Sequence, residues 1–409
     1  MMVDVPTNIS VPEGDLQHRI AILVSKVFDQ AGPQFEDLGG SHNKVLAFTV
    51  PRYRARDSGV WLVNGPQTAY SNGPTPPIIG SDAYVVRTPV PHNSQKVDVK
   101  RSIANLYAIE PHLALPIPRV LKFDLTTNNP LGQPYVIQHR LRGYSLEKLW
   151  EYLNPKQMVS AVREITKLVE MTAAVVAPGA GLVQSDNFPT TKASVFELEK
   201  FPIPSLRDVH PMVNKTNKAA TEPALPQIPI EFLIEQCDRW REIEPDACTG
   251  SEEKTWRKFI AIARSLNIDG WLDLTFHLVH GELVPKNILA VVKDSSSIEI
   301  TGIVGWSSTY FAPKFEVYRA PFWAWDGQDG ETIDTDPPNA VDVPLKKAFC
   351  KTASEEYIRF AFSPEAAIAR RVFRVLRNGM QGKEQQSYAY DVVAKWETLH
   401  PGDNLAKFR

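Results

Sequence analysis

Residues 278–292 read Leu-Val-His-Gly-Glu-Leu-Val-Pro-Lys-Asn-Ile-Leu-Ala-Val-Val. Apolar residues at both ends predict two short buried strands, and the polar residues between them predict a loop that the strands hold rigidly. On such a loop the carboxylate of Glu282 and the amide of Asn287 can point at one spot, as a general base and a metal ligand would. The same pattern fits a structural loop in which His280 and Asn287 hydrogen-bond the backbone, and the spacing alone leaves both interpretations open.

The predicted secondary structure changes at residues 141–144 from mainly strands to mainly helices. Before this point, short apolar runs separated by glycine and proline predict mainly strands, with one helical period at 17–30 and another at 96–109. After it, the periods are mainly helical. Predicted strands lie at 35–50, 61–63, 83–87, 135–141, 278–292 and 298–304, and predicted helices at 145–153, 156–175, 229–245, 252–267 and 341–398. The shift predicts two domains, 1–141 and 142–409, with six prolines marking a surface insertion at about 201–229.

The loop resembles a known family. His280-Gly-Glu-Leu-x-x-x-Asn287-Ile-Leu is similar to the His-Gly-Asp-Leu-x-x-x-Asn-Ile-Leu loop of the aminoglycoside phosphotransferase and choline kinase families, which share the protein-kinase-like fold. Further motifs follow in the family's order over roughly residues 17–400, and the segments after residue 310 resemble the fungal branch. These motifs lie at 39–44, 84–87, 116–120, 130–137, 141–146, 300–306, 310–315 and 321–325.

The resemblance implies an α+β fold of two lobes, a small lobe with a five-stranded antiparallel sheet and a larger, mainly helical lobe. It places Gly39, Gly40 and Ser41 in a loop that covers a nucleotide. It makes Arg87 the basic residue that contacts phosphate, and Asn287 a metal-side ligand, so these five residues are the expected cofactor-binding set.

The same resemblance shows where this chain departs from the family. Gly305 stands where the family has the aspartate that holds magnesium, and Glu282 replaces the catalytic aspartate with a side chain one methylene longer. Displacing a reacting group by about 1 Å costs on the order of 10²-fold in rate. The acidic partner of Arg87 falls at Ser102, unless Asp98 takes its place. We expect the metal site to be lost and predict that Gly305→Asp restores magnesium-dependent ATP binding if only that ligand is missing.

Three functions follow from these departures. The preferred hypothesis is an enzyme of small-molecule metabolism or biosynthesis that has been repurposed for a cyclisation, isomerisation or elimination and needs no cofactor. In it, Glu282, His280 and Lys286 are the catalytic candidates, and a glutamate in an apolar cleft has a pKa suited to proton transfer. The first alternative is a small-molecule phosphotransferase that uses ATP and magnesium. The second is a non-catalytic pseudokinase that binds a ligand or partner.

Composition limits the partners and the cellular location that we expect. The 45 basic and 47 acidic residues give a net charge of −2, which argues against a nucleic-acid partner. We find no signal-peptide pattern and no apolar run of the ~18 residues that a membrane span needs, so we expect a cytoplasmic protein that acts on a small molecule. Three cysteines in 409 residues exclude a disulfide scaffold. The sequence leaves the oligomeric state open.

Overall fold

The structure is a computed structural model, and it describes residues 13–28, 35–39, 43–51, 81–89, 99–185, 196–203, 222–243, 250–325 and 336–408. Several expectations fall outside these residues. They are the strand at 61–63, the site residues Gly40 and Ser41, the alternative Arg87 partner Asp98, and most of the proline-rich insertion, 204–221. In the described part, no helix is both long and apolar enough to cross a membrane.

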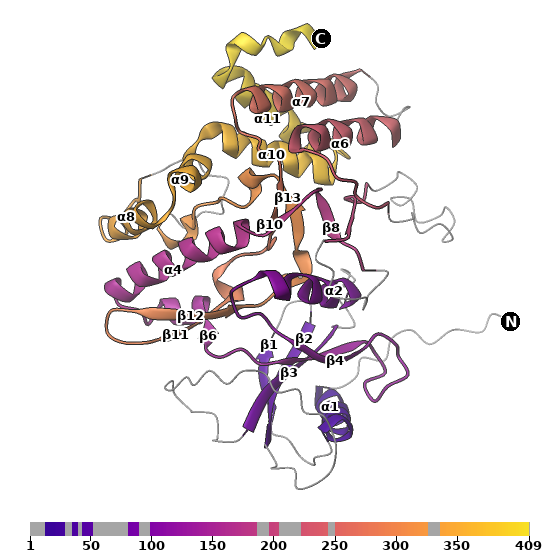
Figure 1. Cartoon of the computed structure of the whole chain (residues 1–409), viewed down its shortest axis with the longest axis vertical. Coiled ribbons are helices and arrows are strands. Elements are labelled where there is room, and N and C mark those ends of the chain that lie inside the picture. Colours follow the sequence, from indigo (N-terminus) through magenta and orange to yellow (C-terminus); the bar gives the residue numbers. More distant parts are fainter. Residues whose placement is uncertain are drawn as a thin grey trace, which may run out of the picture.

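A five-stranded antiparallel sheet forms the small lobe, at the bottom of Figure 1. Its order is β1-β2-β3-β5-β4, with β1 at Phe35–Gly39, β2 at Asn43–Pro51, β3 at Ser81–Pro89, β4 at Val120–Asp124 and β5 at Tyr135–His139. Helix α1 (Glu13–Phe28) packs Ile20, Leu23 and Val24 against one face of this sheet. These apolar residues recur at helical spacing, which is why the sequence alone predicted this helix.

Helix α2 (Val99–Ile109) packs on the other face of the sheet. Val99 and Ile103 contact Val136 of β5 in a small apolar cluster. The opposite side of α2 contacts the one-turn helix η3 (Trp306–Ser308) of the large lobe. Helix α2 therefore lies between the two lobes, as Figure 1 shows.

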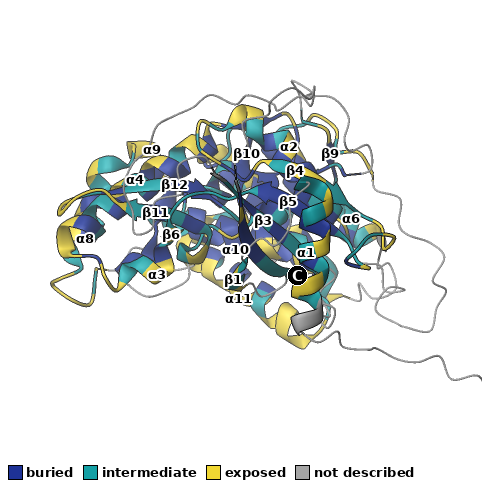
Figure 2. Cartoon of the chain, turned by 90° about the horizontal axis from the view of Figure 1, so that it is seen from below, coloured by how far each residue is buried: buried dark blue, intermediate teal, exposed yellow. Residues whose placement is uncertain are grey.

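The large lobe is mainly helical. Its α-helices are α3 (Leu146–Trp150), α4 (Pro155–Ala173), α6 (Pro229–Ile243), α7 (Ser251–Ile268), α8 (Val343–Thr352), α9 (Glu355–Phe362), α10 (Pro364–Asn378) and α11 (Lys383–Leu399). Ser145 begins α3 as predicted, because its side chain accepts a hydrogen bond from the Lys148 backbone N–H. Buried residues gather where the helices face one another, while exposed residues follow their outer sides (Figure 2).

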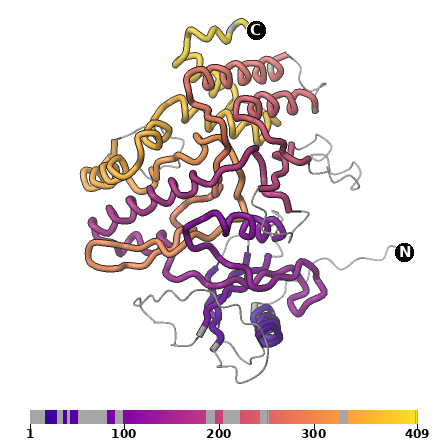
Figure 3. Tube along the Cα trace, in the orientation of Figure 1, coloured from indigo at the N-terminus to yellow at the C-terminus, as the bar shows by residue number. Residues whose placement is uncertain are grey.

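Two small sheets lie inside the large lobe. One has the order β7-β10-β13-β8-β9 and the other β12-β11-β6. Their strands are β6 (Tyr144–Ser145), β7 (Val176–Ala177), β8 (Gly181–Val183), β9 (Leu198–Glu199), β10 (Phe276–Val279), β11 (Ile288–Val292), β12 (Ile298–Ile303) and β13 (Tyr310–Ala312). The sequence predicted β10, β11 and β12, but the short strands β6, β7, β8, β9 and β13 were not predicted. Figure 3 shows the β11–β12 hairpin lying beside α4, which is far away in the sequence.

These lobes confirm the α+β architecture with an antiparallel sheet first and a mainly helical part second. The chain leaves the small-lobe sheet at the end of β5 and enters the large lobe through β6, which pairs with β11. That crossing places the loop before β11 close to the start of the large lobe. The division into domains at residue 141 stays a prediction.

Candidate functional site

The loop between β10 and β11 carries four of the predicted site residues, His280, Glu282, Lys286 and Asn287. The one-turn helix η2 (Pro285–Asn287) forms its second half. Its tight turn requires Gly281, whose φ is +83° and whose missing β-carbon would meet the backbone oxygen of Ser308. The loop is therefore held by the segment that follows Gly305.

His280 is buried beneath this loop and uses both ring nitrogens. Its Nε2–H donates to the carbonyl oxygen of Val304 at 2.9 Å, and its Nδ1 accepts from the backbone N–H of Glu282 at 3.3 Å. The ring packs edge-on against Trp306 with centroids 4.5 Å apart. Burial lowers the pKa of His280 to about 4. At neutral pH the ring is uncharged and both of its nitrogens are occupied by the backbone, so the geometry supports a structural role for His280.

Asn287 braces the same loop. Its Nδ2 donates to the carbonyl oxygen of Glu282 at 2.8 Å, and its own carbonyl oxygen accepts from the Val304 backbone N–H at 2.9 Å. Next to it lies Gly305, which has the left-handed φ of +88°. A β-carbon on Gly305 would lie 2.9 Å from the Asn287 amide atoms Cγ, Nδ2 and Oδ1. The Asn287 side chain thus packs directly against the glycine that stands at the expected metal position.

Glu282 and Lys286 face outward. The Glu282 carboxylate lies 3.7 Å from the Lys286 ammonium, and the two side chains are 47% and 51% exposed. The apolar cleft expected around Glu282 is therefore not found, because a half-exposed side chain lacks that environment. An exposed ion pair of this kind contributes little to stability. Both groups are therefore accessible to a ligand.

The residues around Gly305 do not fit a magnesium ion. Magnesium in proteins is held through carboxylates and phosphate oxygens. Gly305 offers neither, and Asn287 is a neutral amide whose Nδ2 donates to the Glu282 carbonyl oxygen, which leaves one amide oxygen and no carboxylate at this position. Glu299 of β12 is 3.6 Å from Arg142 in an ion pair. Among the residues that the structure describes, no three acidic, histidine or cysteine side chains gather as a metal site would require.

The described small-lobe candidates, Arg87 and Gly39, lie on strands of the five-stranded sheet. Arg87 is on β3, paired with Val45 of β2 and Val136 of β5. Gly39 ends β1 with a φ of +77°, and its backbone N–H donates to Asp37 at 2.8 Å. Within the described ranges, no hydrogen bond or ion pair joins Arg87 or Gly39 to the loop that carries Glu282. The four large-lobe candidates therefore share one loop, while the predicted site as a whole stays a prediction.

Helix α2 makes two contacts with the large lobe that the sequence did not predict. Arg101 forms an ion pair with Glu199 of β9 and donates to the carbonyl oxygen of Val183 at 3.1 Å. Asn105 donates to the carbonyl oxygen of Trp306 at 2.7 Å. The helix therefore carries a basic residue that pairs with the large lobe. Nothing in the sequence near Glu199 marks it as that partner, because the pairing depends on the tertiary fold.

The comparisons with known proteins find similar solved structures only. No family model matches the chain, and no curated protein matches it. Aminoglycoside phosphotransferase APH(4)-Ia is similar at 14% identity and a TM-score of 0.44, over 93% of this chain and 99% of that one.

Two further structures show the same degree of likeness. A thermostable mutant of APH(4)-Ia in a ternary complex with AMP-PNP and hygromycin B has 15% identity and a TM-score of 0.46, over 92% and 98% of the two chains. The GDP complex of wild-type aminoglycoside 2'-phosphotransferase-IIIa has 14% and 0.44, over 95% and 100%. At this identity the likeness does not extend to activity, substrate or residue roles.

Proposed function

We propose that this chain is a small-molecule-binding protein on a phosphotransferase-like fold that does not transfer phosphoryl groups from magnesium–ATP. The observation that carries the proposal is the contact between Asn287 and Gly305. Phosphoryl transfer depends mainly on positioning and on charge stabilisation by metal ions. Here glycine stands at the expected position of the metal-binding carboxylate, and the neighbouring Asn287 offers one neutral amide oxygen, which holds magnesium poorly.

The loop's other polar groups support the same proposal. His280 is neutral and both its nitrogens bind backbone atoms, so it has no nitrogen left to offer a substrate. What remains accessible is the Glu282–Lys286 pair, which can bind a polar ligand through charge and hydrogen bonds.

A second candidate function is the repurposed metabolic enzyme. The specific observation in its favour is that Glu282 and Lys286 lie side by side, with opposite charges and about half of each side chain exposed. Such a pair offers a proton acceptor and a proton donor within one small region. This candidate needs neither ATP nor a metal.

A thermal melt with ATP, with and without magnesium, combined with an assay for ADP release, tests the main proposal. A ligand at a hundred times its dissociation constant adds about 2.7 kcal/mol of stability and raises the melting temperature by about 2–4 °C at this size. We expect no rise that depends on magnesium and no ADP. A magnesium-dependent rise together with ADP release would overturn the proposal.

A metabolite screen without nucleotide separates binder from enzyme. The enzyme candidate predicts turnover that Glu282→Gln and Lys286→Gln both abolish. Lys293→Gln is the matched control, because Lys293 is an exposed lysine just beyond the far end of β11. Binding without turnover of any compound supports the main proposal.

A further inference from the structure

His277 is a buried histidine that none of the roles described above uses. It is the second residue of β10, three residues before His280, and it is only 6% exposed. Its backbone lies opposite Val176 of β7 and Ala312 of β13. A polar ring at this depth needs a partner for each of its nitrogens. The identity of those partners decides the charge of the ring.

Both ring nitrogens of His277 face oxygen atoms. Nδ1 lies 2.6 Å from the carbonyl oxygen of Ala173, the last residue of α4. Nε2 lies 2.8 Å from the Oδ2 atom of Asp273, and the Thr275 hydroxyl is more distant at 3.4 Å. A backbone carbonyl has no proton to donate, so the first contact requires a hydrogen on Nδ1.

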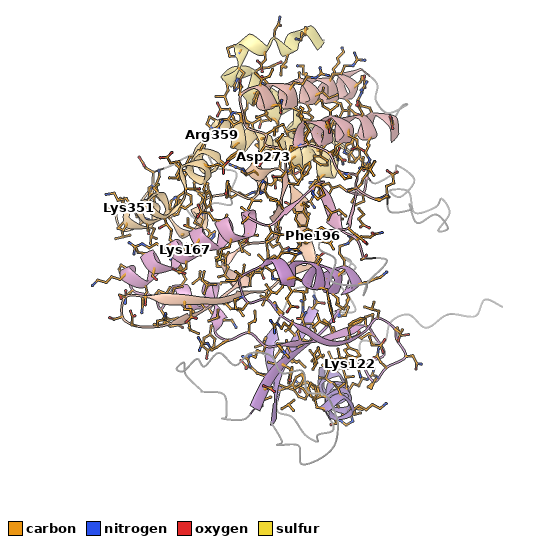
Figure 4. All side chains as sticks on the ribbon, viewed as in Figure 1. Lys122, Lys167, Phe196, Asp273, Lys351 and Arg359 are labelled. Atoms are coloured by element: carbon orange, nitrogen blue, oxygen red, sulfur yellow. The ribbon has the colours of Figure 1, made fainter. Side chains whose placement is uncertain are left out.

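Asp273 requires a hydrogen on Nε2 as well, because it is a carboxylate. Figure 4 labels it in the large lobe, far from the small-lobe sheet. The ammonium of Lys314 lies 2.9 Å from the same Oδ2 atom. Burial raises the pKa of Asp273, but the hydrogen bonds from His277 and Lys314 outweigh burial and lower that pKa below its usual value. A neutral imidazole has only one N–H, so the two contacts together are satisfied only by the imidazolium form of His277.

Charged and titratable groups from several elements surround these contacts. They come from the segment before β10, from the one-turn helix η4 (Lys314–Glu316) and the chain just after it, and from helices α4 and α9: Asp273, Lys314, Tyr318, Glu170 and Glu356. Lys314 lies 2.9 Å from both Asp273 and Glu356. Burial, and after it Glu356, raises the pKa of Tyr318, which is therefore uncharged at neutral pH. Three carboxylates thus share one ammonium, and the C-terminal end of α4 adds negative potential, so the surroundings favour a cation at His277.

We propose that His277 is a pH-sensitive latch between α4 and β10. As an imidazolium it donates to the Ala173 carbonyl and to the Asp273 carboxylate at once. When one proton leaves as the pH rises, a lone pair faces one of these oxygens and that contact opens. This inference goes beyond the proposed function and does not rest on it.

The latch connects two features of the large lobe. Residues 174–176, which directly follow Ala173, line a cavity of about 450 Å³. Strand β10 leads into the loop that carries Glu282. Opening of the latch therefore loosens one wall of this cavity and the base of that loop.

The pH dependence of the latch is opposite to that of His280, whose contacts need a neutral ring. The folded state holds the second proton of His277 more firmly than the unfolded state does. Its stabilisation is therefore present at low pH and is lost as the pH rises and the proton leaves.

Nuclear magnetic resonance of the full chain with ¹⁵N-labelled histidine, from about pH 5.5 to about pH 9, tests the charge of the ring. The reference is His18, an exposed histidine on α1. We expect His277 to lose its second proton at a pH at least about one unit higher than His18 does. The variants His277→Gln and His18→Gln assign the two signals. A midpoint equal to or below that of His18 would overturn the inference.

Removal of the carboxylate tests the contact with Asp273. We expect Asp273→Asn to move the midpoint of His277 down towards that of His18. Asp269→Asn is the matched control, because Asp269 is an exposed aspartate close by in the sequence. Equal midpoints in Asp273→Asn and Asp269→Asn would overturn the inference. If Asp273→Asn fails to fold, the midpoint in the unaltered protein gives the decision.

Hydrogen exchange tests whether the latch opens. The Leu278 N–H donates to the Val175 carbonyl oxygen at 2.9 Å, across the joint between β10 and the end of α4. Its protection, taken as the ratio to the exchange rate of an unstructured peptide at the same pH, reports local opening. We expect this protection to fall at least about tenfold as His277 loses its proton, and to stay constant over the same range in His277→Gln, which does not titrate. The same fall in both proteins would overturn the inference.

Discussion

The amide of Asn287 occupies the space beside the α-carbon of Gly305, so that a β-carbon there would lie 2.9 Å from three of its atoms. Real β-carbons essentially never approach other atoms this closely. Gly305 also has a φ of +88°, which other residues adopt only with strain. A side chain at position 305 therefore has to displace the Asn287 amide, which couples the two positions.

This coupling revises what to expect from Gly305→Asp. The substitution costs about 1–2 kcal/mol for the left-handed backbone and displaces the Asn287 side chain as well. We predict that adding Asn287→Ala removes part of that cost, giving a coupling energy of about 0.5 kcal/mol or more in a double-mutant cycle measured by urea unfolding. Strictly additive costs would show that the two residues do not compete for space.

The binding of magnesium–ATP by the same variants gives a second test of this contact. Sequence alone predicted that Gly305→Asp restores magnesium-dependent ATP binding. The structure adds the condition that the Asn287 side chain has to move. We therefore expect the magnesium-dependent rise in melting temperature to be smaller in Gly305→Asp alone than in Gly305→Asp combined with Asn287→Ala. No rise at all would show that loss of the metal ligand is not the only change in this site.

Gly281 provides a second test of the loop, with Gly39 as its matched control. Both have left-handed φ values, +83° and +77°, but a β-carbon on Gly281 would meet the Ser308 backbone, while one on Gly39 has nothing within 4 Å. We predict that Gly39→Ala costs about 1–2 kcal/mol and that Gly281→Ala costs clearly more. Equal losses in urea unfolding would contradict the close contact with Ser308.

The fold as a whole was predicted from the resemblance to a family, and periodicity predicted its longer elements. The helix predicted at 17–30 is α1 at Glu13–Phe28, and the strand predicted at 135–141 is β5 at Tyr135–His139. These elements bury one apolar stripe or face, and that pattern is visible in the sequence. The short strands β7, β8 and β9 have two or three residues each, too few for any pattern to show.

The site was only partly predictable, for a different reason. The loop at 278–292 is local, so its strand–loop–strand form and the absence of a carboxylate at Gly305 could be read directly. The environments of His280 and Glu282 could not, because burial depends on distant segments such as Val304.

The ion pair between Arg101 and Glu199 fastens α2 to the large lobe, and its side chains are only 19% and 4% exposed. Removing Arg101 leaves a buried carboxylate without its partner. We predict that Arg101→Met lowers stability by about 3–5 kcal/mol, and that adding Glu199→Leu recovers part of the loss. Arg140→Met is the control, since its partner Glu36 is 57% exposed and such pairs contribute about 1 kcal/mol at most. Similar losses of stability for Arg101→Met and Arg140→Met would contradict a stabilising role for the buried ion pair.

His280 makes the stability of the fold depend on pH. Its pKa in the folded state is about 4, below the usual value of about 6.5 in an unfolded chain, so the unfolded state binds a proton first as the pH falls. The stabilisation is complete above about pH 6.5 and is lost as the pH falls towards 4, by about 3 kcal/mol in all.

Urea unfolding at several pH values between 4.5 and 7.5 (about one pH unit apart) measures this dependence. Carboxylates titrate in the same range, so His280→Gln is the comparison: its side-chain amide preserves a donor for the Val304 carbonyl and does not titrate. We predict that the free energy of unfolding falls more steeply with acidification in the unaltered protein than in His280→Gln. If the free energy of unfolding depends on pH equally in both proteins, His280 is not held neutral by burial. It would then again be a candidate for a catalytic acid or base.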